Sequence, residues 1–133
     1  IDDESTREID DGLSAEATPD GGARLWVHVA DPTRWVPQLS ALDREARRRA
    51  TTVYLPEGSV PMYPRALATG PFSLGAGQDS CAMTVRVDLS PDGDLRETAV
   101  GPSTIHVTHR LTYEEADALQ EGEGDPPRGC WPP

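Results

Sequence analysis

Alternating apolar and polar positions predict extended strands in two parts of the chain. Residues 24–30 read RLWVHVA, in which Leu or Val occupies every second position. Residues 83–89 alternate in the same way, and the PDGD turn at 91–94 separates them from a second extended run that continues to residue 107. The pattern therefore predicts one strand followed, later in the chain, by a β-hairpin.

Two capping signatures predict short helices. In Ser40-Ala-Leu-Asp43 the serine hydroxyl can accept from the third amide while the aspartate reaches back, so we expect a helix over 41–50. Thr112-Tyr-Glu-Glu115 repeats this arrangement before a helix over 113–120. Between them, residues 55–75 contain four prolines, which lack an amide donor and restrict the preceding residue. This stretch is predicted to be a long ordered surface loop.

These elements predict an α+β fold with an antiparallel or mixed β-sheet, a β-hairpin and two short helices over residues 1–121. Residues 122–133 contain seven Gly or Pro and no periodicity, which predicts a disordered tail. The 133 residues, 36% of them hydrophobic, allow one modest domain at most. No apolar run approaches the ~20 residues that cross a bilayer, so we expect no membrane association.

The charge distribution limits the kind of nucleic-acid contact that is expected. The net charge of −11 is concentrated in two acidic blocks, residues 1–23 and 66–133, while residues 24–65 are net positive. An anionic chain argues against nonspecific coating of nucleic acid, which depends on Lys and Arg neutralising phosphates. Contact with phosphates would need local arginines or a bound metal ion.

The chain opens with a dense acidic cluster in the sequence IDDESTREIDDG. Its six carboxylates are those of Asp2, Asp3, Glu4, Glu8, Asp10 and Asp11. They can converge only in an irregular loop, because alternate residues of a strand face opposite sides. Mg²⁺ prefers oxygen ligands, and two such ions about 4 Å apart can activate a water and stabilise the leaving oxygen in phosphodiester cleavage. A solvated acidic terminus is the alternative interpretation.

Three segments in order resemble the catalytic RNB domain of the ribonuclease II and ribonuclease R exoribonucleases. They are IDDESTREIDDGLSAE, LWVHVADPTRWV and LDREARRRATTVYLPEGSVPMYP, and the likeness runs from Ile1 to about Ala118. The resemblance implies an intracellular enzyme, its compartment not fixed by the sequence, that hydrolyses single-stranded RNA from its 3′ end. Its products would be nucleoside 5′-monophosphates, its cofactor Mg²⁺, and DNA is not an expected substrate.

The resemblance also implies which residues form the site. The four acidic positions of the family motif fall on Asp2, Glu8, Asp10 and Asp11, with Asp10 assigned to catalysis and all four to the metal ions. Glu8 departs from the usual Asp, retaining a hard oxygen donor on a side chain longer by one methylene. Asp3 and Glu4 lie off the matched positions and are expected to face solvent.

Tyr54, in the VYLP run, corresponds to an aromatic residue of the family that packs beside the 3′-terminal nucleotide. A stacked base is worth about 1–3 kcal/mol, and the ring tolerates any base. A tyrosine that anchors the proline-rich loop is the structural alternative. The arginines on the predicted helix over 41–50 are expected to form a solvated face and are left out of the site.

Two hypotheses of different classes follow. The first is a fragment of an exoribonuclease, the N-terminal part of an RNB domain, which is active only together with the missing C-terminal half and the flanking RNA-binding domains. The second is a catalytically inactive RNB-like module that binds a partner or has a structural role through an exposed sheet edge. Three aspartates at the four motif positions, together with Tyr54, favour the first.

Overall fold

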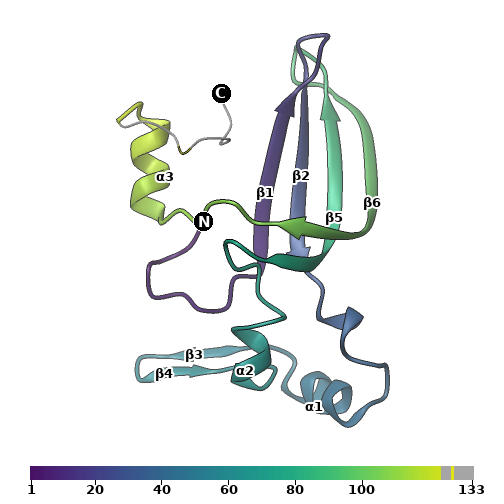
Figure 1. The fold of residues 1–133 in the computed structure, drawn as a ribbon, viewed down its shortest axis with the longest axis vertical. Helices are drawn as coiled ribbons and strands as arrows, with labels where there is room; N and C mark the ends of the chain where they lie inside the picture. The colour runs from purple at the N-terminus through teal and green to yellow at the C-terminus, as the bar shows by residue number, and fades with distance from the viewer. Residues whose placement is uncertain (124–126, 128–133) are drawn as a thin grey trace.

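A four-stranded antiparallel sheet forms the upper part of the computed structural model, which describes residues 1–123 and 127 (Figure 1). Its strand order is β1-β2-β5-β6, and every neighbouring pair is antiparallel. The strands are β1 (Asp11–Ala17), β2 (Ala23–Ala30), β5 (Asp79–Leu89) and β6 (Leu95–His106). The predicted strand and hairpin are thus confirmed, and the α+β fold has an antiparallel rather than a mixed sheet.

Strand β1 corrects the expectation that the opening acidic segment is irregular through residue 12. The strand begins at Asp11, and its residues pair with β2 from Asp11 opposite Val29 to Ala17 opposite Ala23. Its sequence DGLSAEA has weak strand propensity. The strand forms because β2 offers an edge with which it can pair, a long-range effect that a local pattern does not reveal.

The register gives the sheet one apolar and one polar face. Leu13, Val27, Val85 and Val100 lie opposite one another across the four strands and therefore share a face. Leu13 and Val100 are both 68% exposed, so this apolar face is open toward solvent. The next row of the register, which includes His28 and Thr84, lies on the polar face.

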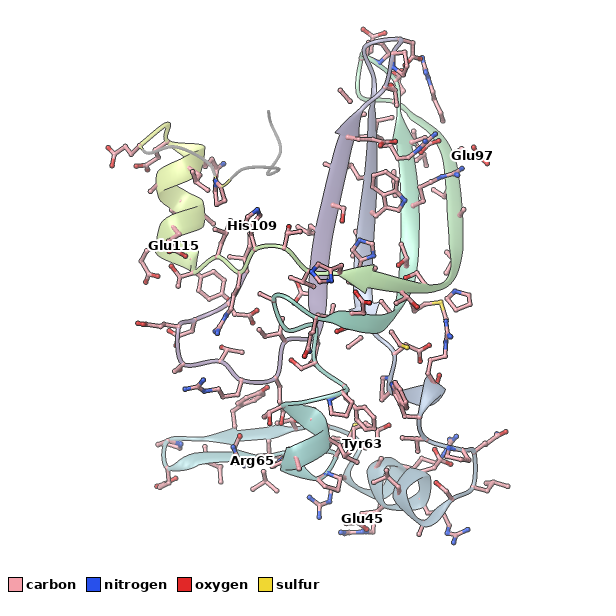
Figure 2. All side chains as sticks on the ribbon, viewed as in Figure 1. Glu45, Tyr63, Arg65, Glu97, His109 and Glu115 are labelled. Atoms are coloured by element: carbon pink, nitrogen blue, oxygen red, sulfur yellow. The ribbon has the colours of Figure 1, made fainter. Side chains whose placement is uncertain are left out.

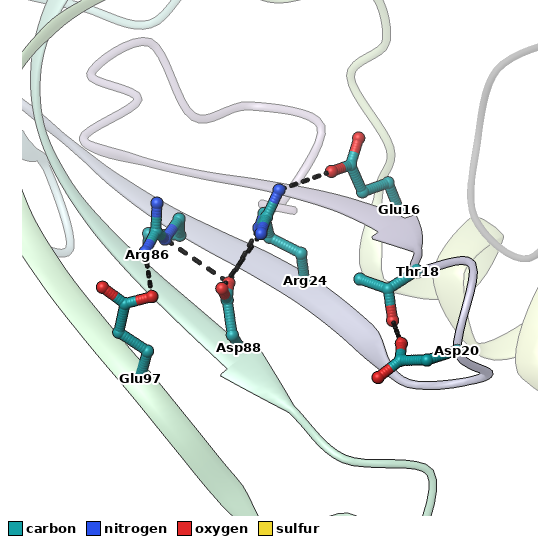
Figure 3. A network of polar contacts seen from close by, with 7 residues as sticks. All are labelled: Glu16, Thr18, Asp20, Arg24, Arg86, Asp88 and Glu97. Carbon is teal, nitrogen blue, oxygen red and sulfur yellow. Dashed lines mark hydrogen bonds and ion pairs between the residues drawn. The ribbon is translucent and has the colours of Figure 1, made fainter.

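An ion-pair network crosses the polar face near the end of the sheet that is remote from the lower unit (Figure 3). Arg24 on β2 pairs with Glu16 on β1 and makes two hydrogen bonds, of 2.8 and 3.0 Å, to Asp88 on β5. Arg86 continues the network to Glu97 on β6. The bonds to Arg24 hold the pKa of Asp88 below its usual range. The network joins all four strands.

Below the sheet lies a smaller unit built from residues 32–68 (Figure 1). It contains the 3₁₀ helix η1 (Pro32–Arg34), helices α1 (Ala41–Arg49) and α2 (Arg65–Ala68), and a two-stranded sheet of β3 (Val53–Leu55) and β4 (Gly58–Val60). Figure 2 places Glu45, Tyr63 and Arg65 in this unit, at the opposite end of the molecule from Glu97. The buried side chains of Ala46, Phe72 and Leu74 belong to its core and to the segment that joins it to β5.

Helix α1 confirms the predicted capping signature, because the Ser40 hydroxyl accepts from the Asp43 amide at 3.1 Å. The long loop predicted over 55–75 is wrong in part, since it contains β4 and α2. The prolines stand between elements instead of excluding them: Pro56 lies in the turn between β3 and β4, and Pro64 is the N-cap of α2. Residues 1–123 consequently contain one α-helix more than the two predicted.

Helix α3 (Tyr113–Gln120) lies beside the N-terminal segment and begins with the predicted capping box of Thr112 and Glu115 (Figure 1). The predicted tail, residues 122–133, lies outside the described residues except at positions 122, 123 and 127. Within the described part of the chain, no helix has the length and apolar character needed to cross a membrane.

Candidate functional site

The acidic segment is fixed where it enters the sheet. The Ile9 amide donates to Ser73 Oγ at 3.0 Å, and the Leu74 amide donates to the Ile9 carbonyl at 2.8 Å. One residue later, the Asp10 carbonyl accepts from the Ala30 amide at 2.7 Å. These bonds come from two segments distant in sequence, so the backbone that carries Asp10 and Asp11 has a defined position at the foot of β1.

Four carboxylates interact through their charges at this point. Partial burial raises the pKa of Asp10, and the negative charges of Glu8, Asp11 and Asp2 raise it further. The other three residues that the sequence assigned to the site therefore lie within electrostatic reach of Asp10. Asp3 and Glu4, assigned to solvent, are both exposed. Hydrogen bonds from Ser5 lower the pKa of Asp3.

A buried oxygen within this group has no hydrogen-bond donor. Among the residues that the structure describes, none donates a hydrogen bond to Asp2 Oδ2, which is shielded from solvent and lies 3.8 Å from the N-terminal nitrogen. A buried acceptor without a partner is costly, and a bound cation or an ordered water would satisfy it. The donor atoms of the cluster are all carboxylate oxygens, which suit a hard divalent cation.

The carboxylates do not form a closed coordination shell. Among residues 1–123 and 127, no group of three or more His, Cys, Asp or Glu side chains is arranged so that it could hold a metal ion. The cluster fits a divalent cation in the chemistry of its donors and in its orphaned oxygen, whereas binding would require the side chains to move closer together.

Glu8 connects the acidic segment to the lower unit. The Thr52 hydroxyl donates to Glu8 Oε2 at 2.9 Å and accepts from the Met62 amide at 3.0 Å. Sequence reasoning missed Thr52. Its only signal is its place in the TTVYLP run, two residues before Tyr54. The extra methylene of Glu8, compared with the Asp that the resemblance implied at this position, lengthens its reach toward this hydroxyl.

Tyr54 lies on β3, opposite Ser59 of β4, and is 69% exposed. Partial burial of its hydroxyl raises the tyrosine pKa, followed by the negative charges of Glu8, Asp10 and Asp2. The exposed ring and the acidic cluster are thus close enough to interact, although they belong to different units. A side chain exposed to this extent has little contact with which to anchor the proline-rich segment.

Three of the four arginines of α1 pair with carboxylates of their own helix, while Arg44 donates to the Leu39 carbonyl. Arg47 pairs with Asp43, while Arg48 and Arg49 both pair with Glu45. Hydrogen bonds from these two arginines lower the pKa of Glu45. This agrees with the solvated face expected from the sequence.

Comparison with known proteins shows that the chain is similar to ribonucleases. The family profile described as "RNB domain" matches residues 1–129. An uncharacterised ribonuclease of Synechocystis sp. is 53% identical over 119 residues, which are 90% of this chain and 18% of that protein. The chloroplastic/mitochondrial ribonuclease II of Arabidopsis thaliana is 46% identical over 119 residues, 90% of this chain and 15% of that protein. The chain spans less than a fifth of the length of these relatives.

Solved structures agree with this assignment. RNase R of Mycoplasma genitalium, in complex with ribose-methylated single-stranded RNA, superposes with a TM-score of 0.85 at 24% identity, over 93% of this chain and 19% of that one. Yeast Ssd1, described as a pseudonuclease, has a TM-score of 0.76 at 29% identity, over 81% of this chain and 13% of that one. From its sequence match over nearly all its residues and from its fold, the chain belongs to the RNB domain family.

Proposed function

We propose that this chain forms part of the RNB domain of a Mg²⁺-dependent 3′–5′ exoribonuclease, which hydrolyses single-stranded RNA to nucleoside 5′-monophosphates. The observation that supports the proposal is that Glu8, Asp11 and Asp2 lie near enough to Asp10 for their negative charges to raise its pKa. Tyr54 is in turn near enough to Glu8, Asp10 and Asp2 for their charges to raise the tyrosine pKa. Such a concentration of like charge is unfavourable by itself, and a divalent cation would relieve it.

Asp2, Glu8 and Asp11 are the residues that would hold Mg²⁺ together with Asp10. When bound, Mg²⁺ supplies Lewis-acid stabilisation of the phosphate and lowers the pKa of an attacking water. Partial burial and the charges of Glu8, Asp11 and Asp2 raise the pKa of Asp10, a perturbation of the kind found at functional carboxylates, which suits a group that orients the water and the scissile phosphate. Asp2 Oδ2, buried and without a donor, is an acceptor available to a cation.

Tyr54 would stack on the base of the 3′-terminal nucleotide. The ring is exposed and near the acidic cluster, so a base packed on it would bring its phosphate toward the carboxylates. Stacking on an aromatic face tolerates every base, which suits an enzyme that degrades RNA without regard to sequence. The single-stranded RNA in the similar RNase R complex is in keeping with such a substrate.

Asp10→Asn tests the proposal in the longest native form of the protein that carries this chain. The variant and the unmodified protein are incubated with Mg²⁺ and a single-stranded RNA labelled at its 3′-terminal nucleotide. We expect early release of labelled 5′-monophosphate from the unmodified protein and a loss of at least about 100-fold in Asp10→Asn, since substitutions merely adjoining a metal site cost 10–100-fold. Glu4→Gln likewise replaces one carboxylate by an amide, at an exposed position outside the site, and should retain activity.

A catalytically inactive RNB-like module is the second candidate. Three observations favour it: the Glu at position 8, the absence of a closed metal group among residues 1–123 and 127, and the similarity to a pseudonuclease. Retained RNA binding without monophosphate release at any Mg²⁺ concentration would decide for this module and against the enzyme.

A further inference from the structure

Arg110 joins the end of the hairpin to the acidic segment across more than one hundred residues of sequence. Its Nη2 donates to three backbone carbonyls, those of Asp3 at 2.9 Å, Glu4 at 3.2 Å and Thr6 at 2.9 Å. The arginine lies in the connection between β6 and α3. Three convergent carbonyls on one guanidinium nitrogen define the conformation of the turn that they belong to.

That turn has its own internal bonds. The Thr6 amide donates to the Asp3 carbonyl at 3.0 Å, and Ser5 donates through its amide and its hydroxyl to Asp3 Oδ1. These contacts shape the turn but do not attach it to the rest of the molecule. Arg110 supplies the attachment, assisted by the neighbouring Leu111 carbonyl, which accepts from the Asp2 amide at 3.2 Å.

The acidic residues of the site lie on both sides of this turn. Glu8, Asp10 and Asp11 follow it. Their backbone is fixed by the bonds of Ile9 to the segment before β5 and of Asp10 to β2, and the Glu8 side chain by its bond to Thr52. Asp2 precedes it, and its amide donates to the Leu111 carbonyl. The turn is thus the backbone connection between Asp2 and the other three acidic residues, so its shape and place affect how close Asp2 stays to Asp10.

Electrostatics work against this arrangement. Residues 1–23 contain eight acidic side chains and one arginine, so the segment repels itself and would extend if it were free. Arg110 brings a positive charge from outside the segment, and that charge contributes to the lowered pKa of Asp3. A guanidinium remains charged at all relevant pH values, which makes the attachment independent of pH.

We infer that Arg110 is a positioning residue, which holds the turn at 3–6 so that Asp2 stays near Glu8, Asp10 and Asp11, from where movement of their side chains can bring the carboxylates together around a divalent cation. The purpose given to this arrangement, binding of a divalent cation, rests on the proposed function. The structural part of the inference, the attachment of the turn, stands on the three hydrogen bonds alone.

The test compares three variants in the longest native form of the protein. Arg110→Met removes the donors and keeps much of the side-chain length. Arg110→Lys keeps the charge and a donor group. Arg7→Met is the matched control, because it removes one positive charge from an exposed position in the acidic segment itself. Circular dichroism and the melting temperature show whether each variant is folded.

Two measurements separate the structural from the functional part. Hydrogen–deuterium exchange reports the attachment: Arg110→Met should speed exchange of the Asp2 and Thr6 amides, whereas Arg7→Met should not. Calorimetric titration with MgCl₂ measures the affinity for Mg²⁺. Arg110→Met should weaken this affinity by about 10- to 100-fold, as loss of a supporting residue does at metal sites. Arg110→Lys should recover part of the affinity, and the KM for RNA at saturating Mg²⁺ should not change.

Unchanged exchange in Arg110→Met would overturn the inference outright. Faster exchange with wild-type Mg²⁺ affinity would also overturn it, since Arg110 would then be merely structural. An equal loss in Arg7→Met would assign the effect to net charge. If the unmodified protein takes up no Mg²⁺, the proposed function fails and with it the role given to Arg110, whereas the exchange data would still decide whether the attachment exists.

Discussion

The Thr52 hydroxyl donates a 2.9 Å hydrogen bond to Glu8 Oε2 and so ties the acidic segment to the strand that carries Tyr54. The hydroxyl oxygen of Thr52 also accepts from the Met62 amide, which places Thr52 between two partners that would otherwise be unpaired. This link explains how the acidic segment and the strand that carries Tyr54, which belong to different units, keep their positions relative to each other.

Thr52→Val should therefore disturb both stability and activity. The valine has the same shape but leaves Glu8 and the Met62 amide without their partner, at an expected cost of about 1–3 kcal/mol in the free energy of unfolding. Chemical denaturation measures the loss, and the RNA assay should show reduced turnover. Thr51→Val is the control, because Thr51 is exposed and its hydroxyl bonds only to the adjacent carbonyl. Equal effects of the two substitutions would contradict the role given to Thr52.

Tyr54→Ala should weaken binding of single-stranded RNA by about 1–3 kcal/mol, the usual contribution of one stacked base. Tyr54→Phe should bind normally, because the stacking face is retained and the hydroxyl is not needed for it. Fluorescence anisotropy with a short RNA in Ca²⁺ or EDTA measures the affinity without cleavage. Tyr113→Ala removes another exposed tyrosine, on α3, and should have no effect. Weak binding by Tyr54→Phe would show that the hydroxyl, not the ring, makes the contact.

His28 should make the stability of the sheet depend on pH. It is buried on the polar face, with Ser14 Oγ 2.9 Å from Nε2 and Thr84 Oγ1 2.7 Å from Nδ1. Burial lowers its pKa in the folded state, so the unfolded chain binds the proton more readily. The stabilisation from neutral His28 is complete above about pH 6.5, the pKa of an unperturbed histidine, and is lost as the pH falls below it toward the folded pKa.

Denaturation curves between pH 5 and 8 test this dependence. His28→Gln should cost about 1–3 kcal/mol at neutral pH, because Ser14 and Thr84 lose partners, and should flatten the decline toward low pH. His106→Gln changes an exposed histidine that pairs with Asp79 and should retain the decline. A decline of the same size in His28→Gln would assign the pH dependence to other groups.

The ion-pair network at the remote end of the sheet should affect stability without affecting the site. Arg24→Gln breaks the bonds to Glu16 and Asp88, so the melting temperature should decrease, while the Mg²⁺ dependence of RNA hydrolysis should not change. Because Arg24 lowers the pKa of Asp88, its stabilising effect is present at neutral pH and is lost as the pH falls through that lowered pKa. A change in Mg²⁺ dependence would show that the two ends of the sheet are coupled.

The helices could be predicted because their signals are local. Ser40 and Thr112 each cap the helix that begins at the next residue, and both bonds span three residues. Strand β1 could not be predicted, since its weak sequence becomes a strand only through pairing with β2. The sequence predicts a loop over 55–75 because prolines interrupt regular structure, whereas Pro56 and Pro64 lie at the boundaries of elements and leave the elements themselves intact.

For the candidate site, the sequence by itself determined the chemistry. The order of residues 2–11 supplied the carboxylates, and the VYLP run supplied the aromatic ring. Only the tertiary structure decided which distant residues contact them. Thr52, 44 residues from Glu8, donates to its carboxylate, and Arg110, more than 100 residues away, donates to the turn at 3–6. The physical reason is that a side chain's chemical type is fixed by the sequence, while a hydrogen bond depends on which distant backbone the fold brings within about 3 Å of it.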